Sequence, residues 1–115
     1  MQAVRSFALS AIVCGAAYAA LFVAPTERSQ GDIQRIFYFH MPSGVNALVA
    51  FTVAFVASVY FLIRRNVKAD WLAVSCMEVG VAFGTVVLIT GPIWAKPVWG
   101  IYWTWDARLT STFVL

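Results

Sequence analysis

The chain of 115 residues is 62% hydrophobic and 11% charged, and its net charge is +3. A soluble domain of this size could not bury so much apolar surface, so the composition excludes an ordinary soluble protein and indicates a membrane protein. The basic residues are scattered along the chain, which excludes the concentrated basic surface of a nucleic-acid-binding protein.

The first predicted element is a membrane-spanning helix over residues 6–24, an apolar run that Pro25 ends. A run of this length crosses the hydrocarbon core of a bilayer, which is ~30 Å thick. A cleaved signal peptide is the alternative, with Arg5 as its charged start and the sequence "AYA" at residues 17–19 as its cleavage site. Because the apolar run continues beyond that site, we favour the membrane span.

The next segment, "GDIQRIFYFHMPSG", predicts a short helix that carries the single histidine of the chain. Asp32 is a suitable N-cap, and Pro42 disfavours helical backbone at the residue before it, so we expect this helix to end near His40. One face of the helix is formed by Ile33, Ile36, Phe37 and His40. A neutral imidazole here can be an axial ligand of haem iron, and an interfacial histidine without a ligand is the alternative.

Two further spans are predicted over residues 45–63 and 71–90. The polar stretch "RRNVKAD" ends the first of them, and the dipeptide Gly91-Pro92 ends the second. The last residues, "LTSTFVL", predict the opening of a fourth span, which needs about twenty residues. We therefore expect an all-α, polytopic membrane protein with three transmembrane helices, the start of a fourth and a Trp-rich outer loop. We expect a single membrane domain over 1–115, and we expect it to be incomplete.

Three residues inside the predicted spans carry reactive or ionisable groups. Glu78 lies roughly 10 Å into the third span, where a carboxylate is costly and either functional, protonated or bonded to a neighbouring helix. Cys14 and Cys76 fall in apolar segments without the spacing of a metal or redox motif, so we expect small buried residues.

Three spans place the region 26–42 and the Trp-rich segment 94–108 on the same side of the membrane. The basic residues are divided evenly between the two sides, although the basic start and the loop after the second span favour a cytoplasmic N-terminus. His40 is thus expected on the side of the tryptophans, whichever side that is.

The segment "VWGIYWTWDARLTS" is unusually rich in aromatic residues. If it is helical, one face carries Trp99, Tyr102, Trp103 and Asp106. Such a face offers flat rings, indole and phenol donors and one carboxylate, which suits a large planar ligand. An aromatic belt that anchors the spans is the alternative.

Two motifs resemble a known family. The stretch "GPIWAKPVWGIYWTWDARLTS" resembles the Trp-rich WWD segment of the haem-handling proteins of cytochrome c maturation, and its ending "DARLTS" is similar to the CcmC branch. The stretch "RIFYFHMPSG" is similar to the first outer-loop histidine motif of that branch. The resemblance covers most of the chain but only about the first half of a six-span protein.

This resemblance implies a binding and delivery protein rather than an enzyme. Such a protein binds haem b as cargo at the outer face of the bacterial inner membrane and passes it to the haem chaperone CcmE, beside the transporter subunits CcmA, CcmB and CcmD. His40 would be one axial ligand of the iron, and a second histidine would lie in a later loop. The implied haem-binding residues are His40, Trp99, Tyr102, Trp103, Trp105 and Asp106.

The chain departs from the family pattern in places, and other functions remain open. Tyr102 stands where the family often has tryptophan, and Pro92 and Ala95 replace small residues before the motif. A haem lyase that joins haem to apocytochrome c is disfavoured by the "DARLTS" ending. A cytochrome b-type carrier is disfavoured because the spans contain no histidine, and a membrane anchor without a ligand is the third alternative.

Overall fold

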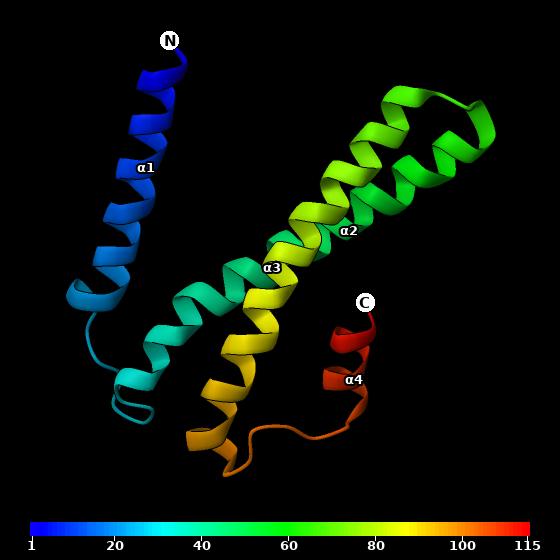
Figure 1. The fold of residues 1–115 in the computed structure, drawn as a ribbon. Helices are drawn as coiled ribbons and strands as arrows, with labels where there is room; N and C mark the ends of the chain where they lie inside the picture. Colours follow the sequence, from blue (N-terminus) through cyan, green and yellow to red (C-terminus); the bar gives the residue numbers. More distant parts are fainter.

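The computed structural model describes residues 1–115 and contains helices and loops without a β-strand (Figure 1). Three of its helical segments are long and apolar enough to cross a membrane, which confirms the predicted all-α, polytopic membrane fold. The elements are α1 (Gln2–Tyr18), the π-helix η1 (Ala19–Val23), the 3-10 helix η2 (Asp32–Ile36), α2 (Phe37–Arg64), α3 (Val67–Trp99) and α4 (Ala107–Val114).

The first span is confirmed as one helical segment, formed by α1 and η1. It ends where expected: Ala24, the residue before Pro25, has an extended backbone with ψ 132°, as steric conflict with a following proline requires. No residue of α1 is buried, and the helix stands apart from α2 and α3 (Figure 1).

The helices α2 and α3 form a long antiparallel pair that contains most of the buried residues. Small side chains line the contact, which lets the two backbones approach closely, as is common between membrane helices. On α2 the buried alanines are Ala47, Ala50, Ala54 and Ala57, and on α3 the matching small residues are Ala73 and Gly80. The contact is tightest at Gly80, where an added Cβ would lie 2.7 Å from the ring of Phe51.

The prediction that a helix ends near His40 was wrong, because α2 runs without a break from Phe37 through Pro42 to Arg64. Proline already has a helical φ, so it removes one backbone hydrogen bond rather than the helix. A full break in apolar surroundings would leave several backbone groups unpaired, which costs more. Asp32 also does not act as an N-cap here. It lies within η2, and Gly31 precedes it.

The prediction that Gly91-Pro92 breaks the third helix was wrong for the same reason. The helix α3 contains Pro92 and continues to Trp99, where Gly100 ends it with a left-handed φ of 79°. Its 33 residues correspond to about 50 Å at 1.5 Å per residue, which exceeds the hydrocarbon thickness of ~30 Å. The last turns of α3 therefore extend beyond the apolar core of the bilayer.

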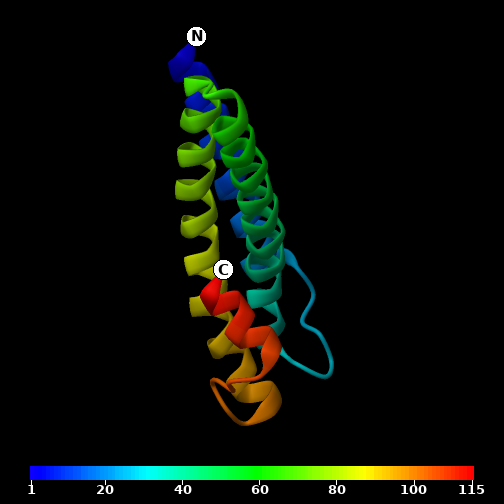
Figure 2. The same ribbon diagram turned by 90° about the vertical axis from the view of Figure 1, so that its right-hand side faces the viewer.

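The four α-helices alternate in direction, so two loops meet at one end of the molecule (Figure 1). The view in Figure 2 shows that the helices form a thin layer with both loops at its lower end. The loop over 24–31 leads into α2, and the loop over 100–106 connects α3 to α4. The segment that carries His40 and the Trp-rich segment share this end, as predicted.

Candidate functional site

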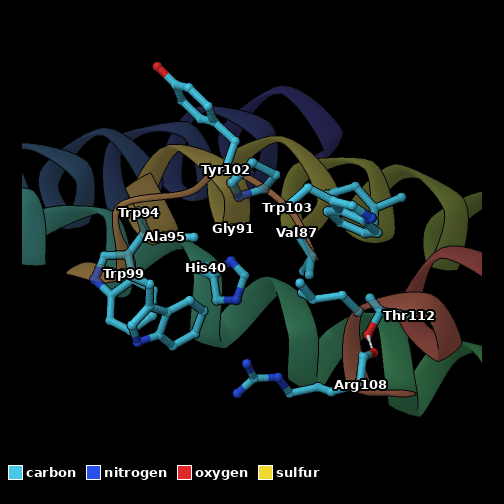
Figure 3. Close-up of a pocket in the computed structure, with 13 residues that line it drawn as sticks. His40, Val87, Gly91, Trp94, Ala95, Trp99, Tyr102, Trp103, Arg108 and Thr112 are labelled. Atoms are coloured by element: carbon cyan, nitrogen blue, oxygen red, sulfur yellow. Dashed lines mark hydrogen bonds between the residues drawn. The ribbon is translucent and has the colours of Figure 1, made fainter. Parts of the chain in front are cut away.

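A pocket of about 160 Å³ lies where α2, α3 and α4 approach one another (Figure 3). His40 enters it from α2, Trp94 and Trp99 from the last turns of α3, Trp103 from the following loop, and Arg108 from α4. Eight of its thirteen lining residues are hydrophobic, so the few polar atoms inside it determine what it can bind.

His40 is half-buried and makes one hydrogen bond, between Nδ1 and the hydroxyl of Thr90 at 2.9 Å. The neighbouring residue on α3 is Gly91, and an added Cβ there would lie 3.4 Å from Cε1 of the imidazole. The ring therefore lies close against α3 through its Nδ1 and Cε1 edge. No protein group hydrogen-bonds Nε2, which leaves that nitrogen available to a ligand in the pocket.

The end of α3 supplies two tryptophans in contact with each other. The rings of Trp94 and Trp99 meet edge to face, with centroids 5.4 Å apart. The guanidinium of Arg108, on α4, lies 5.0 Å from the centre of the Trp99 ring, a distance at which the ring face attracts a cation. A positive charge therefore borders an aromatic surface at the edge of the pocket.

Trp103 contributes a ring that lines the pocket and a buried indole N–H without a hydrogen-bond partner. Such a group is costly when unpaired, because burial removes its bonds to water. The ring is held edge to face by Trp105 at 5.6 Å and by Phe113 at 6.4 Å. The unpaired donor is therefore fixed in place by aromatic neighbours and is suited to an acceptor on a ligand.

Tyr102 borders the pocket but is largely exposed, and Figure 3 shows its hydroxyl directed away from the other labelled side chains. The ammonium of Lys96 lies 5.1 Å from the centre of the Tyr102 ring and also donates a hydrogen bond to the carbonyl of Gly100. These contacts hold the start of the loop against the end of α3.

Asp106 is the N-cap of α4 and does not line the pocket. Its carboxylate accepts hydrogen bonds from the backbone N–H of Leu109 at 2.9 Å and from the hydroxyl of Thr104 at 2.7 Å. The hydrogen bond from Leu109 has the largest effect on this carboxylate, and together with the one from Thr104 it holds the pKa of Asp106 below its usual value. The carboxylate thus fixes the start of the helix that carries Arg108 to the pocket.

Residues 101–105 are not helical and form a Trp-rich loop, as expected, so the helical face considered as an alternative for this segment does not form. The left-handed Gly100 ends α3 directly after Trp99. Trp99, Tyr102 and Trp103 still reach one pocket, although they do so from a helix end and a loop. Trp105 and Asp106 stay outside its lining and contact residues that form it.

Several residues that line the pocket were not among the haem-binding residues predicted from the sequence. Helical spacing brings Val87, Gly91 and Trp94 to one face of α3, and all three line the pocket. The extension of α3 beyond Gly91-Pro92 is what brings Trp94 there. Arg108 had a sequence signal, since it follows Asp106 by two residues at the start of a helix.

One hydrogen bond connects the site to the first loop, and Arg35 of η2 connects that region to the end of the first span. The indole N–H of Trp94 donates to the side-chain oxygen of Gln30 at 3.1 Å. The guanidinium of Arg35 donates to the carbonyl of Leu21 at 2.7 Å and pairs with Asp32 at 3.2 Å. The end of the first span, the 3-10 helix η2 and the end of α3 are thereby held together.

The reactive residues of the spans lie away from this pocket. Glu78 is exposed on α3 and makes no hydrogen bond or ion pair. Cys14 is exposed and Cys76 is half-buried, and both are free thiols. The expectation of buried cysteines was therefore wrong for Cys14, because α1 has no helix packed against it. The chain has no cluster of three or more His, Cys, Asp or Glu side chains that could hold a metal ion.

These features define a multi-pass α-helical membrane protein with a partly apolar, Trp-lined pocket around its single histidine, at one end of the spans. Comparison with known families makes this more specific. The chain belongs to the CcmC family, described as Heme exporter protein C, whose sequence pattern matches residues 1–115.

Individual proteins are also similar to this chain in sequence. The chain is 38% identical over 93 residues to Heme exporter protein C of Bradyrhizobium diazoefficiens, covering 81% of this chain and 35% of that protein. It is 36% identical over 92 residues to Heme exporter protein C of Escherichia coli, covering 80% of this chain and 38% of that protein. A putative cytochrome c biosynthesis ccmC-like mitochondrial protein of Marchantia polymorpha is 36% identical over 100 residues, covering 87% of this chain and 44% of that protein. The chain thus spans less than half the length of these relatives.

Proposed function

We propose that this chain binds haem in the pocket around His40, as part of haem delivery during cytochrome c maturation. The observation that carries the proposal is the combination of an uncommitted imidazole Nε2 with an aromatic, partly buried surface. A haem iron already has the porphyrin nitrogens as ligands and needs only axial ones. A site with one histidine and no metal cluster therefore suits haem better than a bare ion.

The polar atoms of the pocket match the periphery of haem as well as its iron. The macrocycle is flat and apolar, so it packs well on indole rings such as Trp99 and Trp103. Its carboxylates need donors, and the unpaired indole N–H of Trp103 and the guanidinium of Arg108 lie at the same pocket. Charge-assisted hydrogen bonds of this kind are strong in apolar surroundings.

The remaining residues of the proposed site act around this centre. Tyr102 offers a further ring at the rim, Trp105 supports Trp103, and Asp106 fixes the start of α4. The pocket of about 160 Å³ is smaller than the roughly 300–1,000 Å³ of typical ligand pockets. We therefore expect the pocket to widen when haem binds.

The wider function follows from family membership and remains a proposal for this chain. We place the pocket at the outer face of the bacterial inner membrane, with haem b as cargo and with hand-over to a CcmE-type chaperone. The partners would be CcmA-, CcmB- and CcmD-type subunits, and the protein would bind and deliver haem without acting as an enzyme. A second axial histidine would come from sequence present in the longer relatives.

The test is the visible absorption spectrum of the chain, purified in mild detergent from haem-replete cells, with its His40→Ala variant beside it. We expect a haem band that is lost or shifted in the variant, because the axial ligand is removed. Tyr38→Ala is the matched control, since Tyr38 lies two residues earlier on α2 and borders a different surface. A band that is identical in wild type and His40→Ala would contradict the role of His40.

A further inference from the structure

We infer that Thr90 is a positioning residue that holds the His40 imidazole in the tautomer with its proton on Nδ1. The observation behind this is a chain of two hydrogen bonds across the contact of α2 with α3. Thr90 Oγ1 lies 2.9 Å from His40 Nδ1 and 2.7 Å from the carbonyl oxygen of Val86.

The direction of these bonds follows from the number of hydrogens. A threonine hydroxyl has one hydrogen, and within a helix it commonly donates it to the carbonyl four residues earlier. The short bond from Thr90 to Val86 uses that hydrogen. The Thr90 oxygen can then only accept from His40, so the proton of the neutral imidazole must be on Nδ1.

The consequence concerns the other ring nitrogen. In a neutral imidazole one nitrogen carries the hydrogen and the other carries a free electron pair. With the hydrogen on Nδ1, the electron pair is on Nε2, the nitrogen that no protein group contacts. Metal-ligating histidines usually donate their second ring N–H to a fixed acceptor, which orients the ring and raises its basicity.

The position of Gly91 supports the same geometry. An added Cβ at this residue would lie 3.4 Å from Cε1 of the imidazole and 4.0 Å from Nδ1. The ring edge that carries Nδ1 therefore lies directly against α3, within reach of Thr90. The tautomer is thus fixed by contacts that exist without any ligand.

The chain provides a matched control in Thr85. This residue makes the same bond, from its hydroxyl to the carbonyl of Val81 at 2.8 Å, and it lies on the same helix one to two turns earlier. It does not contact His40 or line the pocket. A substitution at Thr85 therefore reproduces the loss of a threonine hydroxyl on α3 without touching the imidazole.

The first experiment reads the tautomer directly, without haem. Because the chain has one histidine, ¹⁵N-labelled histidine gives one pair of ring-nitrogen NMR signals, recorded in detergent at about pH 8, where an ordinary imidazole is neutral. We expect the proton on Nδ1 in the wild type, in Thr90→Ser and in Thr85→Val, and a mixture of tautomers in Thr90→Val. A wild-type proton on Nε2, or an unchanged spectrum in Thr90→Val, would overturn the inference.

The second experiment measures haem affinity, and its interpretation rests on the proposed function. We expect Thr90→Val to weaken haem binding about 10- to 100-fold, as loss of a bond to a metal-ligating histidine typically does. Thr90→Ser should restore the affinity, and Thr85→Val should not alter it. If the wild type bound no haem, the proposed function would fail, while the NMR spectra would still decide the role of Thr90.

Discussion

The polar atoms at the pocket determine what it can bind, and they differ in whether they have a hydrogen-bond partner within the protein. His40 is satisfied at Nδ1 and free at Nε2, whereas the indole N–H of Trp103 is buried and has no partner. An unpaired buried donor costs about 1–3 kcal/mol of stability. A ligand acceptor would remove that cost, so ligand binding and protein stability are linked at this residue.

Trp103→Phe tests this link, because it keeps an aromatic ring and removes the unpaired N–H. We expect haem affinity to fall about tenfold or more, as loss of a hydrogen bond to a charged group implies. We also expect the ligand-free protein to be as stable as the wild type or more stable. Haem titration and thermal unfolding in detergent measure the two effects separately.

Trp105→Phe is the control for that variant. Trp105 is 73% exposed and does not line the pocket, so the loss of its N–H should change neither haem affinity nor stability. Equal losses of affinity in Trp103→Phe and Trp105→Phe would contradict a specific role of the Trp103 N–H.

At the residue scale, the sequence predicted the types of group at the site better than their arrangement. The shared location of His40 and the tryptophans followed from counting spans. The contact of His40 with Thr90 could not be predicted, because it depends on how α3 is rotated against α2, and one sequence does not define that rotation. The helical face that was considered for the Trp-rich segment does not form, because one glycine, Gly100, turns the backbone.

At the scale of elements, the centres of the spans were predicted well, whereas the start of α2 and the end of α3 were not. Apolar composition marks the part of a helix that lies in hydrocarbon, while α2 and α3 continue into less apolar sequence through Pro42 and Pro92. In α4, by contrast, a single side chain determines the start of the helix, since Asp106 accepts two hydrogen bonds there.

The cap on α4 predicts a pH dependence. Hydrogen bonds from Leu109 and Thr104 lower the pKa of Asp106 below its unfolded value, so the cap stabilises α4 above the unfolded pKa and is lost as the pH falls through the folded one. Amide hydrogen exchange at Leu109, corrected for its intrinsic pH dependence, should therefore show less protection in acid. Asp106→Asn should keep the cap without this pH dependence, and equal acid sensitivity in both proteins would contradict the assignment.

The contact between α2 and α3 predicts the effect of a single added methyl group. Gly80→Ala would place a Cβ 2.7 Å from the Phe51 ring, so we expect a loss of about 1–3 kcal/mol from overpacking. Gly84→Ala is the control on the same helix, because its Cβ would lie 4.0 Å from the same ring. Unfolding in mixed micelles measures both, and equal stability of the two variants would show that the helices are not tightly packed at Gly80.

At the scale of the whole molecule, the site lies at one end of a thin helical layer with extents of 53 × 44 × 15 Å. The α2–α3 pair provides a firm base for it, while the first span is held at its end, in η1, by Arg35. The relatives are more than twice as long as the segment they share with this chain. The longer relatives can therefore add walls and side chains to this end of the molecule that this chain does not contain.

The prolines of α3 have a mechanical consequence for the pocket. Pro92 and Pro97 lack the N–H that would tie each of them to the carbonyl four residues earlier. Two links of the helical hydrogen-bond ladder are therefore absent along the segment that carries Trp94 and Trp99. A missing bond offers no resistance to bending, so this end of α3 is more compliant than the rest of the helix. The wall of the pocket can change its curvature around an arriving ligand without breaking a hydrogen bond at these two positions.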